Sequence, residues 1–564
     1  MVHNHSHRRF LSLIIIVLAV LSLVTATSAQ DDTVIIGAPT TTAFRNNPLW
    51  ATSTADFYVF PLILPGLTWF DDQMNPVLAL AEDVTISDDG LTYTFTLPAN
   101  ATWSDGEPIT AADVKFTWEL KSHPALLALP QPPAGRGDIT LVAGVDAYSS
   151  GEADEITGIQ VLDERTVSFT LNSPNFLFLG NATLGILPQH ILSEVDPAAI
   201  ADHPYMEFPS VTSGPYVLTE YVRDSFWRLA AREDYWGEPA AIPNVIIRVF
   251  AELEAQLAAM EAGEIDVTAI PAAETSRFEA LDSVNMVSRG GLGFYVLHFN
   301  MNEPRVVEGC TAEAVAEAYT GRPPLDDVRV RQALSFAIDR DEIIDVIADG
   351  QGTRIFSSIF GPEWLDNSGL EPYDYDPERA LELLAEAGWT LDEAGTRLVD
   401  ADGQPFRQLI YVSQPGEEGF RLGILLQDYL GAIGIPVEIR LTTSANFLPT
   451  IFGEDWDLAR NVGGSLGRDP SESTRFYRTC AGWANALGFS NVEWDTLMDA
   501  GAATTDLAER AAIYNQASRI LNTELPSLFL MTQNNVWAVR DRIQGFTGSA
   551  GNYITWNLPA WTLQ

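Results

Sequence analysis

Lysine is almost absent from this chain, and acidic residues far outnumber basic ones. The only lysines are Lys115 and Lys121, and 32 basic residues face 76 acidic ones, for a formal net charge of −44. Binding to nucleic acid needs clustered Lys and Arg against the phosphates, so this charge excludes nucleic acid as a natural partner. It also disfavours adsorption to an anionic lipid surface.

A hydrophobic run long enough to cross a membrane comfortably is also lacking. The apolar run near the N-terminus covers residues 11–24, whereas a membrane helix needs about 20 apolar residues. Arg8 and Arg9 precede this run and small residues follow it up to Ala29, which is typical of a secretory signal over residues 1–29. An uncleaved anchor is the alternative. No cysteine follows the run, so a bacterial lipid anchor is not indicated, and we expect a periplasmic or otherwise extracytoplasmic protein.

Cysteine is scarce, because Cys310 and Cys480 are the only two in the chain. In an oxidising compartment an even pair of this kind favours a disulfide, and two buried thiols are the alternative.

Histidine is too scattered to suggest a metal site. Beyond the signal segment the histidines are His123, His190, His203 and His298. They offer no ligand spacing, and residues 400–406, DADGQPF, are interpreted as a hairpin turn rather than a calcium loop. We therefore expect neither a metal nor a cofactor.

The chain has 564 residues, which is more than one hydrophobic core usually supports, so two or three lobes are expected. Its hydrophobic fraction of 46 % is typical of a well-packed soluble protein. Strands are predicted where short stretches are β-branched or alternate apolar and polar residues. These stretches are 33–38, 84–97 as a hairpin around an Asp-Gly turn, 214–222, 226–234, 244–250, 408–413, 436–442, 457–462, 536–546 and the Trp-rich tail.

Helices are predicted by capping signals and by apolar spacing. Thr110 with Asp113 forms a variant of the capping box, and Gly263 ends an amphipathic stretch that starts near residue 251. Asp376 followed by Pro377 starts another helix. Further helices are predicted within 325–350 and over 420–434, and strand–helix alternation there indicates an α/β lobe with a mixed sheet.

Residues 461–480, NVGGSLGRDPSESTRFYRTC, contain the G-x-S-x-G spacing of a hydrolase nucleophile elbow around Ser465. An elbow needs a helix directly behind the serine, but Pro470 follows soon after. The hydrolase order of serine, acid and histidine also needs a histidine downstream of Ser465, and the sequence has none there. The chain is therefore not expected to be an enzyme, and a secreted serine hydrolase is the disfavoured alternative.

Eight segments, in this order, resemble the extracytoplasmic solute-binding proteins of peptide-type ABC transporters, family 5, which also include nickel and oligosaccharide binders. The segments are LALAEDVTISDDGLTYTFTL (78–97), WSDGEPITAADVKFTWEL (103–120), TSGPYVLTEY (212–221), REDYWG (232–237), LAAMEAGEIDV (257–267), PPLDDVRVRQALSFAIDRDEII (323–344), YDPERALELLAEAGW (375–389) and GFSNVEWDTLMDAG (488–501). No single segment identifies the family, but eight segments in the same order over nearly the whole chain make the resemblance specific.

The resemblance implies an α/β fold of the periplasmic-binding-protein-like type II, with two lobes, a hinge and an extra small domain on lobe I (cluster C type). The implied divisions are 1–29 signal peptide, 30–64 lobe I, 65–190 extra domain, 191–294 lobe I again, 295–524 lobe II and 525–564 the return to lobe I. A site between lobes lets closure remove water from the ligand.

In this family the stretch around Ser465 is a lobe II loop that lines the cleft. Its first acid, which aligns with Asp469, pairs with the free amine of a bound peptide; the alternative is that Asp469 only caps the turn at Pro470. The other ligand-binding candidates are Trp483, which the core leaves less explained, Gly464, Ser465, Leu466 and Arg468 of the same loop, and Thr52, Ser53 and Thr54, which align with the segment that flanks the ligand on the opposite lobe. An ordinary surface turn is the alternative for the last three.

Two positions depart from the family pattern. Dipeptide binders carry an arginine for the ligand carboxylate where this chain has about Gln414, and Leu466 replaces the usual aromatic before the acid. The first departure favours a longer peptide or an uncharged ligand over a dipeptide.

The resemblance implies a monomeric protein that captures an oligopeptide and delivers it to the permease subunits of an ABC transporter. One alternative is an oligosaccharide or glycoside binder, suggested by the 14 tryptophans, although Trp118 and Trp236 lie in segments expected to be core and Trp69 and Trp483 are less explained. A sensor subunit without a permease is another.

Overall fold

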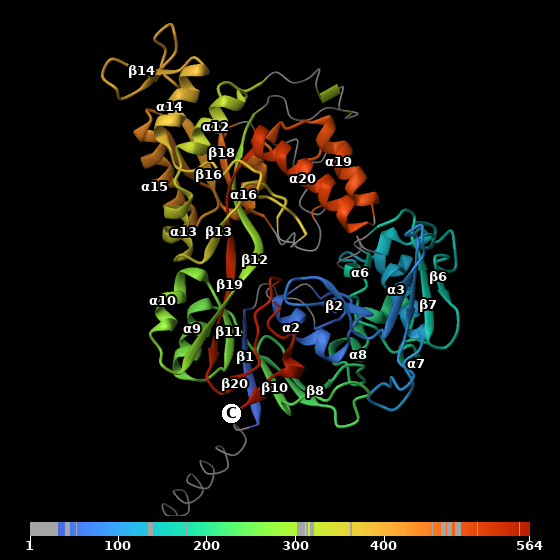
Figure 1. Ribbon diagram of the computed structural model, residues 1–564. Helices are drawn as coiled ribbons and strands as arrows, with labels where there is room; N and C mark the ends of the chain where they lie inside the picture. The colour runs from blue at the N-terminus through green and yellow to red at the C-terminus, as the bar shows by residue number, and fades with distance from the viewer. Residues whose placement is uncertain are drawn as a thin grey trace, which may run out of the picture.

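The computed structural model describes residues 32–39, 46–51, 53–133, 139–175, 178–301, 311, 314–315, 321–360, 364–453, 455–463, 470, 477–479, 487–504, 506–551 and 553–564. Labels follow Figure 1.

One mixed sheet of 11 strands runs through the molecule. Its order is β17-β16-β18-β12-β19-β11-β1-β10-β9-β8, and β13 pairs with β19 beside this path. The strands are β1 (Thr33–Pro39), β8 (Tyr216–Val222), β9 (Phe226–Ala231), β10 (Asn244–Phe250), β11 (Val267–Ile270), β12 (Val284–Phe299), β13 (Gly352–Arg354), β16 (Leu409–Ser413), β17 (Val437–Leu441), β18 (Leu458–Gly463) and β19 (Ser527–Arg540).

Two long antiparallel strands join the two lobes. β12 has 16 residues and β19 has 14, and their ladder runs from Val284 opposite Arg540 to His298 opposite Ser527. One half of the ladder continues through β11 into the lower lobe of Figure 1, and the other half pairs with β18 and β13 in the upper lobe. The expected two-lobe α/β fold is confirmed, and the lobes are joined through this shared sheet.

The lower lobe, lobe I, has a parallel centre in which β1 pairs with both β10 and β11. β10, NVIIRVF, pairs parallel with β1 and antiparallel with β9, and its buried residues are Val245, Ile247 and Phe250. The helices of this lobe are α2 (Thr54–Ile63), α9 (Leu253–Ala262) and α10 (Thr275–Glu279). α9 ends where Gly263 adopts the left-handed conformation at φ 76°, as its sequence predicts.

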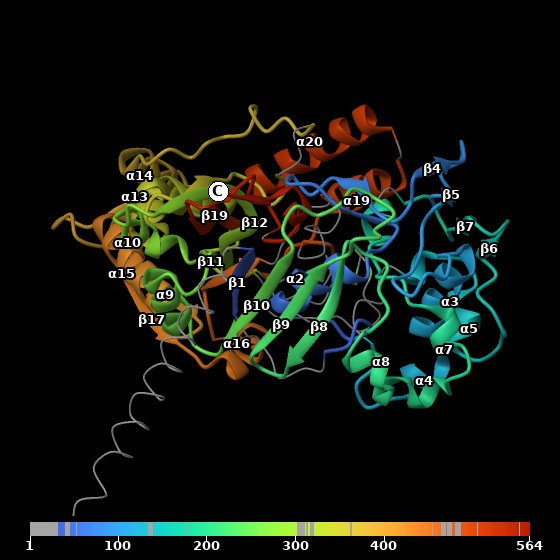
Figure 2. The same ribbon diagram turned by 90° about the horizontal axis from the view of Figure 1, so that it is seen from below.

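A separate four-stranded antiparallel sheet lies at one side of lobe I (Figure 2). Its strands are β4 (Asp83–Ile86), β5 (Thr92–Thr96), β6 (Ile159–Val161) and β7 (Thr166–Thr170), and α3 (Ala111–Ser122) packs on β6 and β7. The predicted hairpin between β4 and β5 is confirmed. The capping box of Thr110 and Asp113 is also present, with the Asp113 carboxylate accepting the Thr110 N–H at 2.8 Å.

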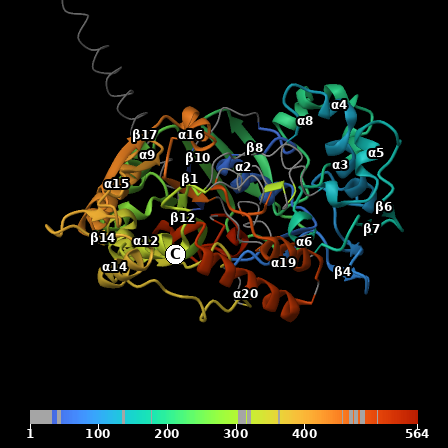
Figure 3. The same cartoon turned by 90° about the horizontal axis from the view of Figure 1, so that it is seen from above.

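The upper lobe, lobe II, has helices on both faces of its part of the sheet, as seen from above in Figure 3. They are α12 (Val328–Phe336), α13 (Arg340–Ala348), α14 (Pro377–Glu386), α15 (Glu417–Ala432), α16 (Ser444–Ile451), α19 (Val492–Ala503) and α20 (Leu507–Glu524). Asp376 caps α14 by accepting the Arg379 N–H at 2.9 Å, and Pro377 is its first residue, as predicted.

The remaining elements are short. They are β2 (Thr68–Phe70), β3 (Pro76–Leu78), β14 (Thr390–Leu391), β15 (Leu398–Val399), β20 (Ile543–Gln544), β21 (Thr562–Leu563), α4 (Pro124–Leu127), α5 (Val145–Ser149), α6 (Phe178–Asn181), α7 (Gln189–Leu192), α8 (Pro204–Glu207), η1 (Ile139–Leu141), η2 (Pro197–Asp202), η3 (Ala272–Glu274) and η5 (Leu558–Ala560). Among the described residues, no helix combines the length and apolarity that crossing a membrane requires.

The Trp-rich tail is mostly turns and the helical turn η5, so its prediction as extended segments is wrong except for β21. Trp561 is fully buried and its ring N–H donates to Asn557 at 2.8 Å. This packing folds the tail back on itself, which overrides the strand preference of its aromatic residues.

Candidate functional site

The ladder between β12 and β19 is interrupted where the chain passes from one lobe to the other. Gly290 lies opposite Asn534, but the next paired residue, Phe294, lies opposite Thr532. Residues 291–293 of β12 therefore lie opposite a single residue of β19, Gln533. An added Cβ at Gly291 would overlap the carbonyl oxygen of Gln533, so only glycine allows the two backbones to approach this closely.

A pocket of about 630 Å³ opens beside this interruption and is lined from both lobes. Its lining comprises Gln73, Arg289, Gly290, Gly291, Leu292, Thr353, Arg354, Ile355, Phe356, Ser357, Phe360, Asn367, Thr532 and Ala550. The mixture of apolar side chains with a few polar groups, and the size, are those of a small-molecule or peptide subsite. We refer to it as the hinge pocket.

The turn between β2 and β3 forms the lobe I side of the hinge pocket. Arg289 of β12 makes an ion pair with Asp72 of this turn, and the Asp72 carbonyl accepts the Ala550 N–H at 2.8 Å. A small apolar cluster of Phe70, Met74, Leu292 and Ala550 lies beside it. The turn is thus held to the joining strands by packing and by charge.

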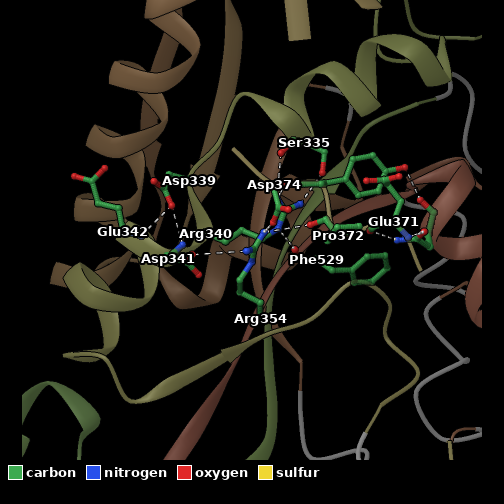
Figure 4. A network of polar contacts seen from close by, with 12 residues as sticks. Ser335, Asp339, Arg340, Asp341, Glu342, Arg354, Glu371, Pro372, Asp374 and Phe529 are labelled. Carbon is green, nitrogen blue, oxygen red and sulfur yellow. Dashed lines mark hydrogen bonds and ion pairs between the residues drawn. The ribbon is translucent and has the colours of Figure 1, made fainter. Parts of the chain in front are cut away.

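Arg354 contributes to the lobe II side of the pocket, but its guanidinium is directed elsewhere. Its Nη2 donates to Asp374 at 2.9 Å and to the Pro372 carbonyl at 3.3 Å, and Asp341 lies 3.6 Å from Nη1 (Figure 4).

Arg340 lies next to Arg354 in the same view and is 2 % exposed. It donates to the carbonyls of Phe529, Ser335 and Tyr373 at 2.8–3.1 Å, and so ties the start of α13 to β19, to the end of α12 and to the segment before α14. Burial, with the nearby Arg354 charge adding, lowers the pKa of Arg340 to about 9. These contacts make it a structural residue.

The carboxyl ends of three lobe II strands meet at the edge that faces the joining segment. β16 is parallel to β17 and β18, and β18 ends at Gly463 opposite Phe294 of β12. In open α/β sheets, ligands bind at this edge, outside the carboxyl ends of the strands. The loop that the sequence analysis assigns to the ligand leaves β18 at this edge.

A polar network lies at the same edge. Tyr295 donates its hydroxyl to Gln533 at 2.9 Å or to Glu418 at 3.1 Å, and Arg460 donates to Glu418 at 2.6 Å while its guanidinium stacks 5.0 Å from the Tyr295 ring. Burial, with the Glu418 charge adding, raises the pKa of Tyr295 well above its usual range. The Glu418 side chain is 42 % exposed, so this carboxylate is accessible to solvent.

Three predicted ligand residues lie in the described part of the chain. Gln414 follows β16 at the carboxyl edge and is exposed. Ser53 is 8 % exposed and caps α2, since its hydroxyl accepts the Asp56 N–H at 3.2 Å, and Thr54 is the first residue of that helix. The structure therefore assigns Ser53 a capping role that the sequence analysis did not name.

The other predicted ligand residues and the predicted disulfide lie outside the described residues. They are Thr52, Gly464, Ser465, Leu466, Arg468, Asp469, Trp483, Cys310 and Cys480. These assignments, like the numbered domain divisions, stay predictions.

Sequence reasoning missed Arg289, Asp72 and the network around Glu418. Arg289 and Asp72 are 217 positions apart, and no local pattern links them. The glycines of RGGLG, residues 289–293, were the one signal available, since glycine inside a strand marks an irregular or close-packed site.

Among the described residues, no three His, Cys, Asp or Glu side chains form a group that could hold a metal ion. His298 is 2 % exposed, hydrogen-bonds Ser527 at 2.7 Å and has its pKa lowered to about 3 by burial.

Trp118 is in the core as predicted, whereas Trp236 is only half-buried. Trp69 packs on Tyr553, 5.3 Å between ring centroids.

Comparison with known proteins identifies related chains. The family model described as bacterial extracellular solute-binding proteins, family 5 middle, matches residues 75–485. The oligopeptide-binding protein AppA of Bacillus subtilis is 24 % identical over 517 residues, covering 91 % of this chain and 87 % of AppA. The dipeptide-binding protein of Escherichia coli is 25 % identical over 482 residues, covering 83 % of each chain. Among solved structures, the ABC transporter substrate-binding protein CtaP of Listeria monocytogenes superposes with a TM-score of 0.74 at 25 % identity, covering 94 % of this chain and 99 % of CtaP.

Proposed function

Because the chain belongs to family 5 of the bacterial extracellular solute-binding proteins, we propose that it captures an oligopeptide between its lobes and delivers it to an ABC transporter permease. The observation that carries the proposal is the hinge pocket, which both lobes line beside the carboxyl edge of the lobe II strands. A pocket shared by two lobes can close over an extended ligand and remove water from its polar groups.

Peptide is favoured over other solutes by the names of the relatives. AppA is an oligopeptide binder and the E. coli relative a dipeptide binder. The uncharged Gln414 at the position expected to hold a dipeptide carboxylate favours the longer ligand of the two. An extended peptide also offers main-chain hydrogen bonds at every residue, which suits a pocket beside the stretch of β12 that is left out of the ladder with β19.

The protein is proposed to act as a monomer outside the cytoplasmic membrane after removal of residues 1–29. It is proposed to bind without catalysis, which is supported by its membership of a family of solute-binding proteins. His298 itself is held in the core by Ser527 and, with a strongly lowered pKa, is poorly suited to act as a general base at neutral pH.

Mass spectrometry of the purified full chain tests this function. Protein isolated without denaturation is desalted, denatured and analysed for released small molecules, and the same protein after unfolding, dialysis and refolding is the control. We expect a set of peptides from the first sample and none from the second. Recovery of oligosaccharides in place of peptides would overturn the peptide assignment, and steady ester or peptide turnover would overturn the non-catalytic one.

A further inference from the structure

We infer that Arg289 binds a carboxylate of the captured peptide, so that the hinge pocket selects ligands with a free acid over their amides. The inference rests on the proposed peptide-binding function and names the residue that binds the carboxylate of the peptide. It concerns a residue outside every segment that the family resemblance marks as ligand-binding.

Charge in the hinge pocket singles out Arg289. Among the described residues that line it, the positive side chains are Arg289 and Arg354. The Arg354 guanidinium is turned toward Asp341, Asp374 and the Pro372 carbonyl (Figure 4). Arg289 is therefore the cation that this part of the pocket offers to a ligand.

The Arg289 guanidinium is oriented by its ion pair with Asp72 and keeps further N–H groups for a ligand. Its Nη2 bonds to Asp72, whose own backbone is fixed by the hydrogen bond from Ala550. The Arg289 side chain is 37 % exposed, and a guanidinium has five N–H groups in a planar fork. A second carboxylate can therefore bind to the remaining N–H groups, while Asp72 keeps the fork oriented.

Space for that carboxylate exists directly beside Arg289. Arg289 itself lines the hinge pocket of about 630 Å³, so a carboxylate that enters the pocket can reach the guanidinium. The regular ladder with β19 stops at Gly290, next to Arg289, and resumes only at Phe294. Gln73, next to Asp72, is exposed at the rim and can donate a neutral hydrogen bond to the same group.

An anion enclosed by lobe closure needs a charged partner, because transfer of an unpaired carboxylate out of water is strongly unfavourable. Gln414, at the lobe II edge, carries no charge. Arg289 supplies the missing cation from the joining strand, so the two lobes can close on a peptide whose acid end lies toward the hinge.

The test uses two synthetic pentapeptide libraries that are identical except for a C-terminal carboxylic acid or carboxamide. Binding to the full chain is measured by native mass spectrometry with both libraries in competition. We expect wild type to prefer the acids by about tenfold or more, as for the loss of one charge-assisted hydrogen bond. Arg289→Gln should abolish the preference, and Arg289→Lys should retain part of it.

Arg248→Gln is the matched control, since its side chain is 42 % exposed and pairs with one carboxylate, Glu264 at 2.9 Å, but does not line the hinge pocket. It should leave the ratio of acids to amides at its wild-type value. Equal binding of the two libraries to wild type would overturn the Arg289 assignment while peptide binding stands. Binding of neither library would overturn the proposed function itself. Thermal melts of each variant without peptide separate loss of folding from loss of selectivity.

Discussion

Ser276 and Asp349 connect the two lobes on the α10 side of the joining strands. Both the hydroxyl and the backbone N–H of Ser276 in α10 donate to Asp349 at the end of α13, at 2.6 and 3.2 Å. Asp349 caps α13 in the left-handed conformation, at φ 48°. In Figure 1, α10 belongs to the lower lobe and α13 to the upper lobe, so the contact spans the hinge.

Asp349→Asn should loosen this contact without straining the backbone, because asparagine also tolerates the left-handed region. The two hydrogen bonds from Ser276 lose their charged acceptor, which for an exposed contact is expected to remove about 1 kcal/mol or less, so affinity for a bound peptide should change by up to about fivefold. Small-angle scattering checks the expected ligand-induced fall in the radius of gyration, in wild type and variant. If wild type gives superimposable curves with and without a saturating peptide, the closure model does not hold for this protein.

Gly291→Ala should destabilise the joining strands. An added Cβ meets the Gln533 carbonyl oxygen, so β12 and β19 must separate locally, and overpacking of this kind typically lowers the free energy of unfolding by about 1–3 kcal/mol. Gly290→Ala is the matched control for stability, because its Cβ enters open space. Thermal melting measures both. Equal midpoints for the two variants would contradict the close approach of the strands.

His298 should make folding sensitive to acid. Asn461 Nδ2 lies 3.2 Å from Nε2 of the ring and Ser527 lies 2.7 Å from Nδ1, and burial lowers the pKa to about 3. In the unfolded chain the ring takes up a proton near pH 6.5, which the folded protein rejects. The stability from neutral His298 is therefore fully present above pH 6.5 and declines by up to about 1.4 kcal/mol per pH unit as the pH falls toward 3.

His298→Gln cannot be protonated in this way and should show a shallower loss of stability between pH 6.5 and 4.5. Urea unfolding at each pH measures the difference, and the carboxylates common to both proteins cancel in the comparison. Parallel pH profiles for wild type and variant would show that His298 does not carry this linkage.

Asp469 lies outside the described residues, and its role at the peptide amine stays a prediction. Asp469→Asn should weaken binding of free-amine peptides at least about tenfold, because an ammonium enclosed by the lobes needs a charged partner. N-acetylation should weaken wild type by a similar factor and the variant little, since both changes remove the same interaction. Unchanged affinity with a lower melting temperature would instead support a role in capping the turn at Pro470.

Short motifs of neighbouring residues predicted where several helices begin or end. Thr110 with Asp113, Asp376 with Pro377, and Gly263 mark helix ends that the structure contains. Each depends on hydrogen bonds or backbone preferences within a few residues, so neighbouring letters suffice to recognise it. The resemblance of eight segments in the same order indicated the two-lobe family. A match that extends over nearly the whole chain is specific, whereas a single motif is not.

Only the tertiary structure decided how the lobes are joined and what lines the space between them. The strands β12 and β19 were not recognised as one continuous ladder, because their pairing joins residues about 230–256 positions apart, such as His298 with Ser527 and Val284 with Arg540. Arg289 meets Asp72 for the same reason: strand pairing and the packing of the β2–β3 turn on Leu292 bring distant residues together. The sequence by itself thus determined the family, the helix ends and the extracytoplasmic character, whereas the charges that face the hinge pocket depend on long-range pairing that no local pattern encodes.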